Sequence, residues 1–205
     1  MTRIVLATHN PGKIAELHRI LGGLEVTGLD AFPGAPDVPE TELTFEGNAL
    51  LKARAIAEFT GLPAVSDDSG LCVDALNGMP GVLSARWSGR FGAATGDRDA
   101  ANLQLVLDQI ADVADGRRGA AFVCAAVLVV PGGAEHRVEG RMRGALIREP
   151  RGTGGFGYDP IFVPDGESRT TAEMTPDEKD AISHRGKAFR ALAALVPAAV
   201  AAESA

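Results

Sequence analysis

The apolar residues of this chain follow two patterns, and the first is a set of short continuous runs. Residues 4–7, 63–65 and 120–130 form such runs, which are typical of strands buried on both faces. The run at 120–130 is the most apolar and is expected to be a central strand. At 137–144, charged residues alternate strictly with apolar residues and glycine, which predicts an antiparallel partner strand with one face in water.

The second pattern is helical spacing, in which apolar residues recur every three or four positions. It predicts one helix with Asn10 as its N-cap and another that is capped by Thr44 and ended by Gly61. A third helix is expected after Asp97. The capping box at 175–178 predicts that the last helix begins there.

Length and composition are those of an ordinary globular protein. The chain has 205 residues, of which 45% are hydrophobic and 23% are charged, so it can build one core or two lobes that share one. We expect a single domain over residues 1–197, followed by an alanine-rich tail at 198–205.

The net charge limits the kinds of partner that the protein can bind, and the cysteines indicate its compartment. A formal net charge of −7 and a pI near 5.1 argue against nucleic acid or an anionic membrane as the main partner. Cys72 and Cys124 lie in apolar surroundings without paired spacing, as core cysteines do. These cysteines indicate a reducing, cytoplasmic location. The N-terminus lacks a signal-peptide pattern and no apolar run is long enough to cross a bilayer, so a soluble protein is expected.

The segment 66–71 is the strongest candidate for chemistry. Asp67 and Asp68 follow the apolar run at 63–65, so a buried strand is expected to deliver two carboxylates to its own end. Open α/β sheets usually bind their ligands at such an end. The alternative is a plain loop, because Asp, Ser and Gly also form turns readily.

Two lysines and a third acid lie near the starts of predicted helices. At 10–13, a helix N-terminus with free N–H groups, a favourable dipole and Lys13 would suit an anion such as phosphate, although the Walker spacing is absent. Asn48 and Lys52 share one face of the next helix, and Glu40 lies just before it. For each of these charged residues the alternative is a solvated side chain without a function.

Two segments nearer the C-terminus combine aromatic, glycine and cationic residues. The loop at 152–160 is rich in glycine, which permits close approach of a ligand, and Phe156 and Tyr158 offer faces on which a flat ring can stack. The residues at 183–186 interrupt a helical pattern where cationic groups gather, which indicates that these groups face something anionic or polar. A flexible loop and a charged outer helix face are the alternatives.

Five separated stretches together resemble one known family, the inosine triphosphate pyrophosphatases. These dITP/XTP pyrophosphatases hydrolyse non-standard purine nucleoside triphosphates. The resemblance extends over the chain up to its tail and implies an α/β fold, with an elongated mixed sheet, flanking helices and two lobes around a central cleft. It also implies a homodimer and a requirement for Mg²⁺. The stretches are Thr8-His9-Asn10-Pro11-Gly12-Lys13, Thr44-Phe45 through Asn48-Ala49 to Lys52-Ala53, Asp67-Asp68-Ser69-Gly70-Leu71 with Pro80-Gly81 and Ser84-Ala85-Arg86, Gly155-Phe156-Gly157-Tyr158-Asp159-Pro160, and Ser183-His184-Arg185.

The resemblance further implies a reaction and a role for each matching residue. Water would cleave the triphosphate into a monophosphate and pyrophosphate, which keeps non-standard purines out of DNA and RNA. Asp68 would act as the base, would hold Mg²⁺ together with Glu40, and would be supported by Asp67. The phosphate-binding residues would be Thr8, His9, Asn10, Pro11, Gly12, Lys13, Lys52 and Ser69. The base-binding residues would be Phe156, Gly157, Tyr158, Asp159, Lys179, His184 and Arg185.

Selection of a 6-keto purine would follow from donors such as Lys179 and Arg185. The amino group of adenine would leave these donors unpaired, at a cost of about 1–3 kcal/mol for each. One alternative function is a nucleotide-binding sensor without turnover, against which the acid pair and the two lysines argue, because a sensor needs no base. Another is an enzyme of the same fold that prefers a different modified nucleotide.

The chain departs from the family pattern at two positions around the second helix. Glu42 stands where the family usually has glycine, and Gly47 stands where it usually has glutamate. Because that glutamate would complete a capping box with Thr44, we expect a looser helix start, with Glu46 as a partial replacement.

Overall fold

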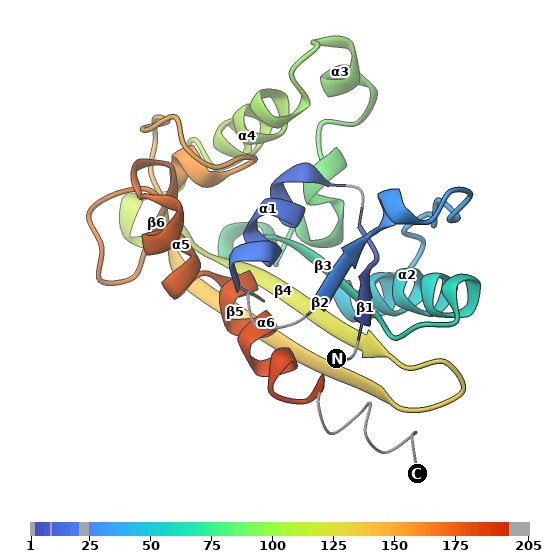
Figure 1. Cartoon of the computed structure of the whole chain (residues 1–205). Helices are drawn as coiled ribbons and strands as arrows, with labels where there is room; N and C mark the ends of the chain where they lie inside the picture. Colours follow the sequence, from blue (N-terminus) through green and yellow to red (C-terminus); the bar gives the residue numbers. More distant parts are fainter. Residues whose placement is uncertain (1–2, 9, 21–24, 197–205) are drawn as a thin grey trace. The chain divides into compact units, whose positions relative to one another are not determined.

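A mixed six-stranded sheet is the central element of the computed structural model, which describes residues 3–8, 10–20 and 25–196 (Figure 1). The strand order is β2-β1-β3-β4-β5-β6, with β1 parallel to β2 and β3, and β5 antiparallel to β6. The strands are β1 (Arg3–Leu6), β2 (Glu25–Gly28), β3 (Ala64–Val73), β4 (Gly119–Val129), β5 (Glu135–Leu146) and β6 (Phe162–Pro164). The α-helices are α1 (Pro11–Ile20), α2 (Phe45–Thr60), α3 (Gly89–Ala94), α4 (Arg98–Gln109), α5 (Pro176–Ile182) and α6 (His184–Ala193).

The chain divides into two compact units, and β3, β4 and β5 contribute residues to both. The first unit consists of Met1–Asp68, Cys124–Gly140 and His184–Ala205, and the second of Ser69–Val123 and Arg141–Ser183. The expected tail at 198–205 lies outside the described residues, and the single domain over 1–197 stays a prediction. None of the helices in the described ranges is both long and apolar enough to cross a membrane.

In the first unit, successive residues of a strand face opposite helix layers, as the pleat of a strand requires. Ile4 and Leu6 of β1 belong to a buried cluster with α1 and α6, which lie side by side (Figure 1). Val5 and Ala7 belong to a second buried cluster, with α2. The unit therefore has a sheet between two helix layers, and residue parity decides which layer a strand side chain meets.

The second unit has its own core, built around α4. Leu103 and Val106 of that helix, with Ile110 directly after it, pack with residues of β3, β4 and β5, and Trp87 packs against this cluster. Arg118 is only 2% exposed. Its guanidinium donates to three backbone carbonyls, those of Ile110 (2.7 Å), Leu146 (2.9 Å) and Ile147 (3.2 Å). These bonds satisfy backbone carbonyl groups where α4 and β5 end.

The predicted helix boundaries are confirmed by the caps that the side chains form. The Asn10 side chain accepts from the Lys13 N–H, Thr44 accepts from the Gly47 N–H, and Gly61 ends α2 in the left-handed conformation. Asp97 caps α4, and the capping box at Thr175 opens α5. The expected interruption also occurs, since Ser183 separates α5 from α6.

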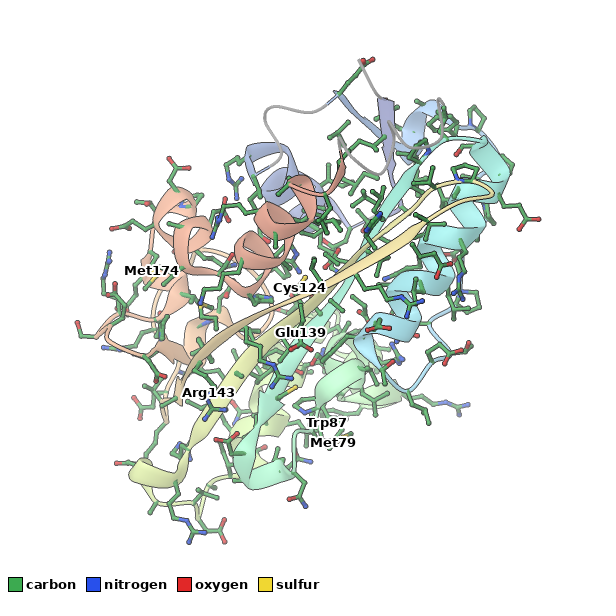
Figure 2. The ribbon with its side chains drawn as sticks, turned by 90° about the horizontal axis from the view of Figure 1, so that it is seen from below. Met79, Trp87, Cys124, Glu139, Arg143 and Met174 are labelled. Atoms are coloured by element: carbon green, nitrogen blue, oxygen red, sulfur yellow. The ribbon has the colours of Figure 1, made fainter. Side chains whose placement is uncertain are left out.

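The two strand patterns near the centre of the sheet are confirmed as well. Strand β4 is buried along nearly its whole length, and β5 alternates between exposed and buried positions. Glu139 and Arg143 mark its exposed face (Figure 2). The cysteines form no disulfide in the described chain, and Cys124 lies in the core.

One prediction about the acidic segment is wrong, because β3 does not end before the aspartates. It continues from Ala64 to Val73, so Asp67 and Asp68 lie inside the strand and not in a loop after it. The neighbouring β1 pairs with β3 only as far as Leu6 and Val65. The strand thus carries its acids past the end of β1, where side chains from helices can reach them.

Candidate active site

Asp67 and Asp68 point to opposite faces of the sheet because they are consecutive in a strand. Val65, which shares its parity with Asp67, lies in the cluster with α1 and α6, whereas Ala64 lies in the cluster with α2. Accordingly, Asp67 meets side chains from α1 and α6, and Asp68 meets Asn48 of α2. The two acids therefore do not form a carboxylate pair that shares one proton.

Asp67 is the buried anion of a charge network. Its Oδ2 lies 3.0 Å from Nζ of Lys13 and 3.3 Å from Nε of Arg185, and the Cys124 thiol donates to it at 3.7 Å. Burial by itself would raise the pKa of Asp67, but the positive charges of Lys13, Arg185 and Lys52 outweigh it and hold the pKa well below its ordinary value. Asp67 is therefore ionised and a poor base.

Arg185 extends the same network to α1. Its guanidinium forms a second ion pair, with Glu16, and both side chains are buried. Burial disfavours the charged form of Arg185, but the negative charges of Asp67 and Glu16 overcome this and raise its pKa. The structure thus places Arg185 among the acids of the first unit, and the adjacent His184 is buried in the same unit. Contact of either residue with a purine stays a prediction.

Asp68 lies in a different electrostatic environment. Asn48 donates from Nδ2 to its Oδ2 at 3.0 Å. Burial, followed by the negative charge of Glu40, raises the pKa of Asp68, while Lys13 and Lys52 only partly oppose this. A carboxylate with a raised pKa binds a proton more readily than an ordinary one, so Asp68 is the better base of the two acids.

Two lysines from different helices converge on one backbone atom. Nζ of Lys13 and Nζ of Lys52 lie 3.4 Å and 2.9 Å from the carbonyl oxygen of Asp67. Lys52 is also paired with Glu40, at 2.7 Å. Two ammonium groups beside a helix N-terminus are partners that suit phosphate groups, although each is paired with a carboxylate here.

The segment before α1 is closed by its own hydrogen bonds. The Asn10 N–H donates to the Thr8 hydroxyl at 3.2 Å, and the Lys13 N–H donates to the Asn10 side chain at 3.1 Å. His9 lies outside the described residues, and for Pro11 and Gly12 only the helical backbone is described. Ser69 follows Asp68 on β3, is half-buried and belongs to the second unit.

Glu40 and Asp68 are the carboxylates that fit a divalent cation. Each lies close enough to the other for the charge of Glu40 to raise the pKa of Asp68, and a cation would relieve this repulsion. The described ranges hold no group of three His, Cys, Asp or Glu side chains arranged for a metal ion. Mg²⁺ is commonly held by one or two carboxylates together with substrate phosphates, so two carboxylates suffice.

The glycine-rich loop of the second unit is organised by a buried acid, Asp159. Its Oδ2 accepts from the Phe156 N–H at 2.9 Å and from Nζ of Lys179 at 2.7 Å, and its Oδ1 accepts from the Thr171 hydroxyl at 2.8 Å. The Lys179 ammonium lies 5.0 Å from the centre of the Phe156 ring, which is a cation–π contact. Asp159 thus holds in place two of the residues predicted to bind the base.

The two aromatic residues of this loop differ in exposure. Phe156 is 37% exposed, whereas Tyr158 is 5% exposed, lies in the core of the second unit and donates from its hydroxyl to the Ser84 carbonyl at 2.8 Å. Between them, the Gly157 N–H donates to Asp99 at 3.0 Å. Phe156 therefore presents a ring surface for stacking, and the buried Tyr158 ring does not.

Comparison with known proteins identifies the family. The model of the Ham1 family matches residues 4–195. The chain belongs to the Ham1 family. A protein of Streptomyces coelicolor named dITP/XTP pyrophosphatase is 62% identical over 200 residues, which are 96% of this chain and 98% of the relative. A protein of Frankia alni with the same name is 60% identical over 196 residues, 95% of this chain and 96% of the relative.

Solved structures agree with this assignment. A HAM1 protein from Coxiella burnetii has a TM-score of 0.85 and 43% identity, over 97% of this chain and 100% of that one. A dITP/XTP pyrophosphatase from Mycobacterium abscessus has a TM-score of 0.75 and 58% identity, over 93% and 98%. The predicted family and the mixed-sheet α/β fold class are thereby confirmed.

Three residues that contact predicted site residues within their own unit were given no role from the sequence: Glu16, Asn48 and Thr171. Glu16 looks like any exposed acid of an amphipathic helix, and its partner Arg185 lies 169 residues further along the chain. Asn48 gave a partial signal, because it shares a helix face with Lys52. Thr171 gave none.

Proposed function

We propose that this Ham1 protein is an enzyme that hydrolyses dITP, ITP and XTP to the monophosphate and pyrophosphate with Mg²⁺. One observation carries the proposal: a buried carboxylate with a raised pKa, Asp68, lies with Glu40 and Lys52 at the end of β1, in a chain whose relatives are named dITP/XTP pyrophosphatases. Hydrolysis of a phosphoanhydride needs a base for water and positive charge for the phosphates, and these residues can supply both.

Asp68 is the base in this proposal. Its carboxylate takes a proton from the attacking water, a contribution of about 10²–10⁴ in rate for a well-placed general base. Asp67 has the opposite task, because its lowered pKa keeps it ionised as the counter-charge of Lys13 and Arg185. The neighbouring acids therefore divide proton transfer and charge balance between them.

Lys13 and Lys52 bind the phosphates in this proposal, aided by the dipole of α1, because the N–H groups of Asn10 and Lys13 already donate within the segment. Glu40 and Asp68 would be the protein ligands of Mg²⁺. The bound ion supplies charge neutralisation on the phosphate oxygens. With the two lysines it accounts for triphosphate binding by a protein with a net charge of −7.

Recognition of the purine falls to the loop of the second unit in this proposal. The exposed ring of Phe156 offers a stacking face, and Lys179, fixed by Asp159, offers a donor for a 6-keto oxygen. An adenine amino group cannot accept from such a donor, so ATP would be a poor substrate.

The test is the release of pyrophosphate and monophosphate from ITP, dITP, XTP, ATP and GTP, each with and without Mg²⁺. The proposal expects metal-dependent release from ITP, dITP and XTP and little from ATP, whose amino group cannot accept from Lys179. GTP, which also has a 6-keto oxygen, tests whether the site distinguishes purines by more than that oxygen. Binding of ITP without release would instead identify a sensor, and release only from another modified nucleotide would replace the substrate class. Asp68→Asn should bind ITP without hydrolysis, while Asp108→Asn, on the exposed side of α4, should match the parent. Unchanged hydrolysis by Asp68→Asn would remove the base assignment.

A further inference from the structure

Asn48 of α2 is a fully buried polar residue that connects two parts of the first unit. Its exposed fraction is 0%. Its Nδ2 donates to Oδ2 of Asp68 on β3 at 3.0 Å, and its Oδ1 accepts from the Glu42 N–H in the preceding loop at 2.9 Å. Since a backbone N–H can only donate, the second bond fixes the amide oxygen toward the loop and the amide N–H group toward Asp68.

Lys52, one helical turn later, repeats the same arrangement. It donates to Glu40 Oε1 in the loop at 2.7 Å and to the Asp67 carbonyl on β3 at 2.9 Å. Residues four apart lie on one face of a helix, so α2 touches the loop and the strand at two successive levels. Lys52 contacts the loop and the strand through a charged ammonium group, which can also bind a phosphate. Asn48 contacts them through a neutral amide that is fully buried.

We propose that Asn48 is a positioning residue, which fixes the orientation of the Asp68 carboxylate and ties to it the loop that carries Glu40. The inference rests on the proposed function, because it gives Asp68 a task that depends on orientation. Two bonds hold a buried amide against rotation, and a carboxylate bonded to that amide loses its own rotational freedom. A base displaced by a fraction of its hydrogen-bond length loses much of its effect on the rate.

The decisive variant is Asn48→Asp, which has nearly the same shape. The new carboxylate can still accept from the Glu42 N–H, but it cannot donate to Asp68 and repels it. We expect kcat to fall about 10²-fold, the lower range for loss of a general base. KM for ITP should change by less than about threefold, because Lys13 and Lys52 are unchanged, and such a split marks loss of an interaction that matters after binding.

The matched control is Asn102→Asp in the second unit. Asn102 is equally buried, at 1% exposed, and its Oδ1 accepts from the Ser88 N–H and the Ser88 hydroxyl, both at 2.7 Å. A carboxylate keeps both bonds, so this variant carries the cost of a buried charge without touching Asp68. Its kcat should stay within about threefold of the parent.

A second variant, Asn48→Ser, keeps the inference testable if Asn48→Asp folds poorly. Serine is too short for either bond and adds no charge. It should lower kcat as Asn48→Asp does, and hydrogen exchange of the Glu42 N–H should speed up in Asn48→Ser but not in Asn48→Asp. Parent-like kcat in either folded variant, or unchanged Glu42 exchange in Asn48→Ser, would overturn the inference. If the parent protein does not hydrolyse ITP, the proposed function is refuted instead. Hydrogen exchange of the Glu42 N–H then still tests whether Asn48 holds the loop.

Discussion

At the scale of single residues, the environment of each acid decides its chemistry. Asp67 faces three cations and has a lowered pKa, whereas Asp68 has a raised pKa because it is buried near Glu40. The strand pleat alone separates these environments, since the two residues are covalent neighbours. A one-residue shift in the register of β3 would exchange their surroundings, which makes the strand pairing itself a requirement of the site.

The first prediction concerns the stability that Asp67 provides. Asp67→Asn removes the charge and leaves Lys13 and Arg185 without their shared counter-ion, so we expect a loss of about 3–5 kcal/mol in the free energy of unfolding. Urea denaturation measures this loss. Asp74→Asn is the control, because Asp74 pairs with Arg143 at the exposed surface, where a pair contributes about 0–1 kcal/mol. Equal losses in the two variants would contradict the prediction.

The second prediction is the pH dependence of the same contribution. The folded-state pKa of Asp67 lies below its unfolded value, so its stabilisation is complete above the unfolded pKa and is lost as the pH falls through the folded one. The unfolded value is about 3.9, so the loss should begin near pH 4. Urea denaturation of the parent and of Asp67→Asn between pH 7 and pH 3 should show their stability difference shrinking toward low pH. A constant difference would count against the ion network.

At the scale of elements, the two departures from the family pattern, Glu42 and Gly47, lie against each other at the start of α2. A Cβ atom on Gly47 would lie 2.7 Å from Cβ and 2.9 Å from Cγ of Glu42. Glu42 therefore fills the space that a side chain at position 47 would need. Thr44 still accepts from the Gly47 N–H, so half of the capping box is present and only the glutamate half is missing.

The third prediction follows from this steric coupling. Gly47→Glu alone should destabilise the protein by about 1–3 kcal/mol, as overpacking does. Combining it with Glu42→Gly should recover most of the loss, because the space is vacated and the capping box of Thr44 is completed. A double-mutant cycle by urea denaturation gives the coupling, expected in the range of about 0.5–3 kcal/mol. Simple additivity would show that the two positions are independent.

At the scale of the whole molecule, charge distribution outweighs net charge. A chain with a net charge of −7 repels a triphosphate at long range, and in our proposal Lys13, Lys52 and Mg²⁺ offset this repulsion at the acid site. Mg²⁺, the homodimer and the cytoplasmic location implied by the resemblance or by the composition stay predictions. Sedimentation at several protein concentrations would decide the oligomeric state.

The fourth prediction separates local from global electrostatics. Affinity for a non-hydrolysable ITP analogue without Mg²⁺ should weaken as salt is added, because added ions screen the contacts with Lys13 and Lys52. Lys52→Gln should weaken binding, and the affinity of this variant should fall less with added salt than the affinity of the parent does. Lys187→Gln, an exposed position on α6, changes the net charge equally and should leave affinity near that of the parent. Calorimetric titration at two salt concentrations checks this, and equal effects of the two substitutions would mean that net charge dominates.

The sequence by itself determined helices α1, α2, α4 and α5, their caps, the buried central strand and the family, because these depend on residues within a few positions or on motif order. Asn10, Thr44, Asp97 and Thr175 each cap a helix by contacts within three residues, which local pattern reveals. Only the tertiary structure decided that β3 carries its aspartates to opposite faces, that Arg185 binds Asp67 across 118 residues of chain, and that Tyr158 is buried while Phe156 is not. Those outcomes depend on which elements pack together, and contacts between distant segments leave no periodic signal in the sequence.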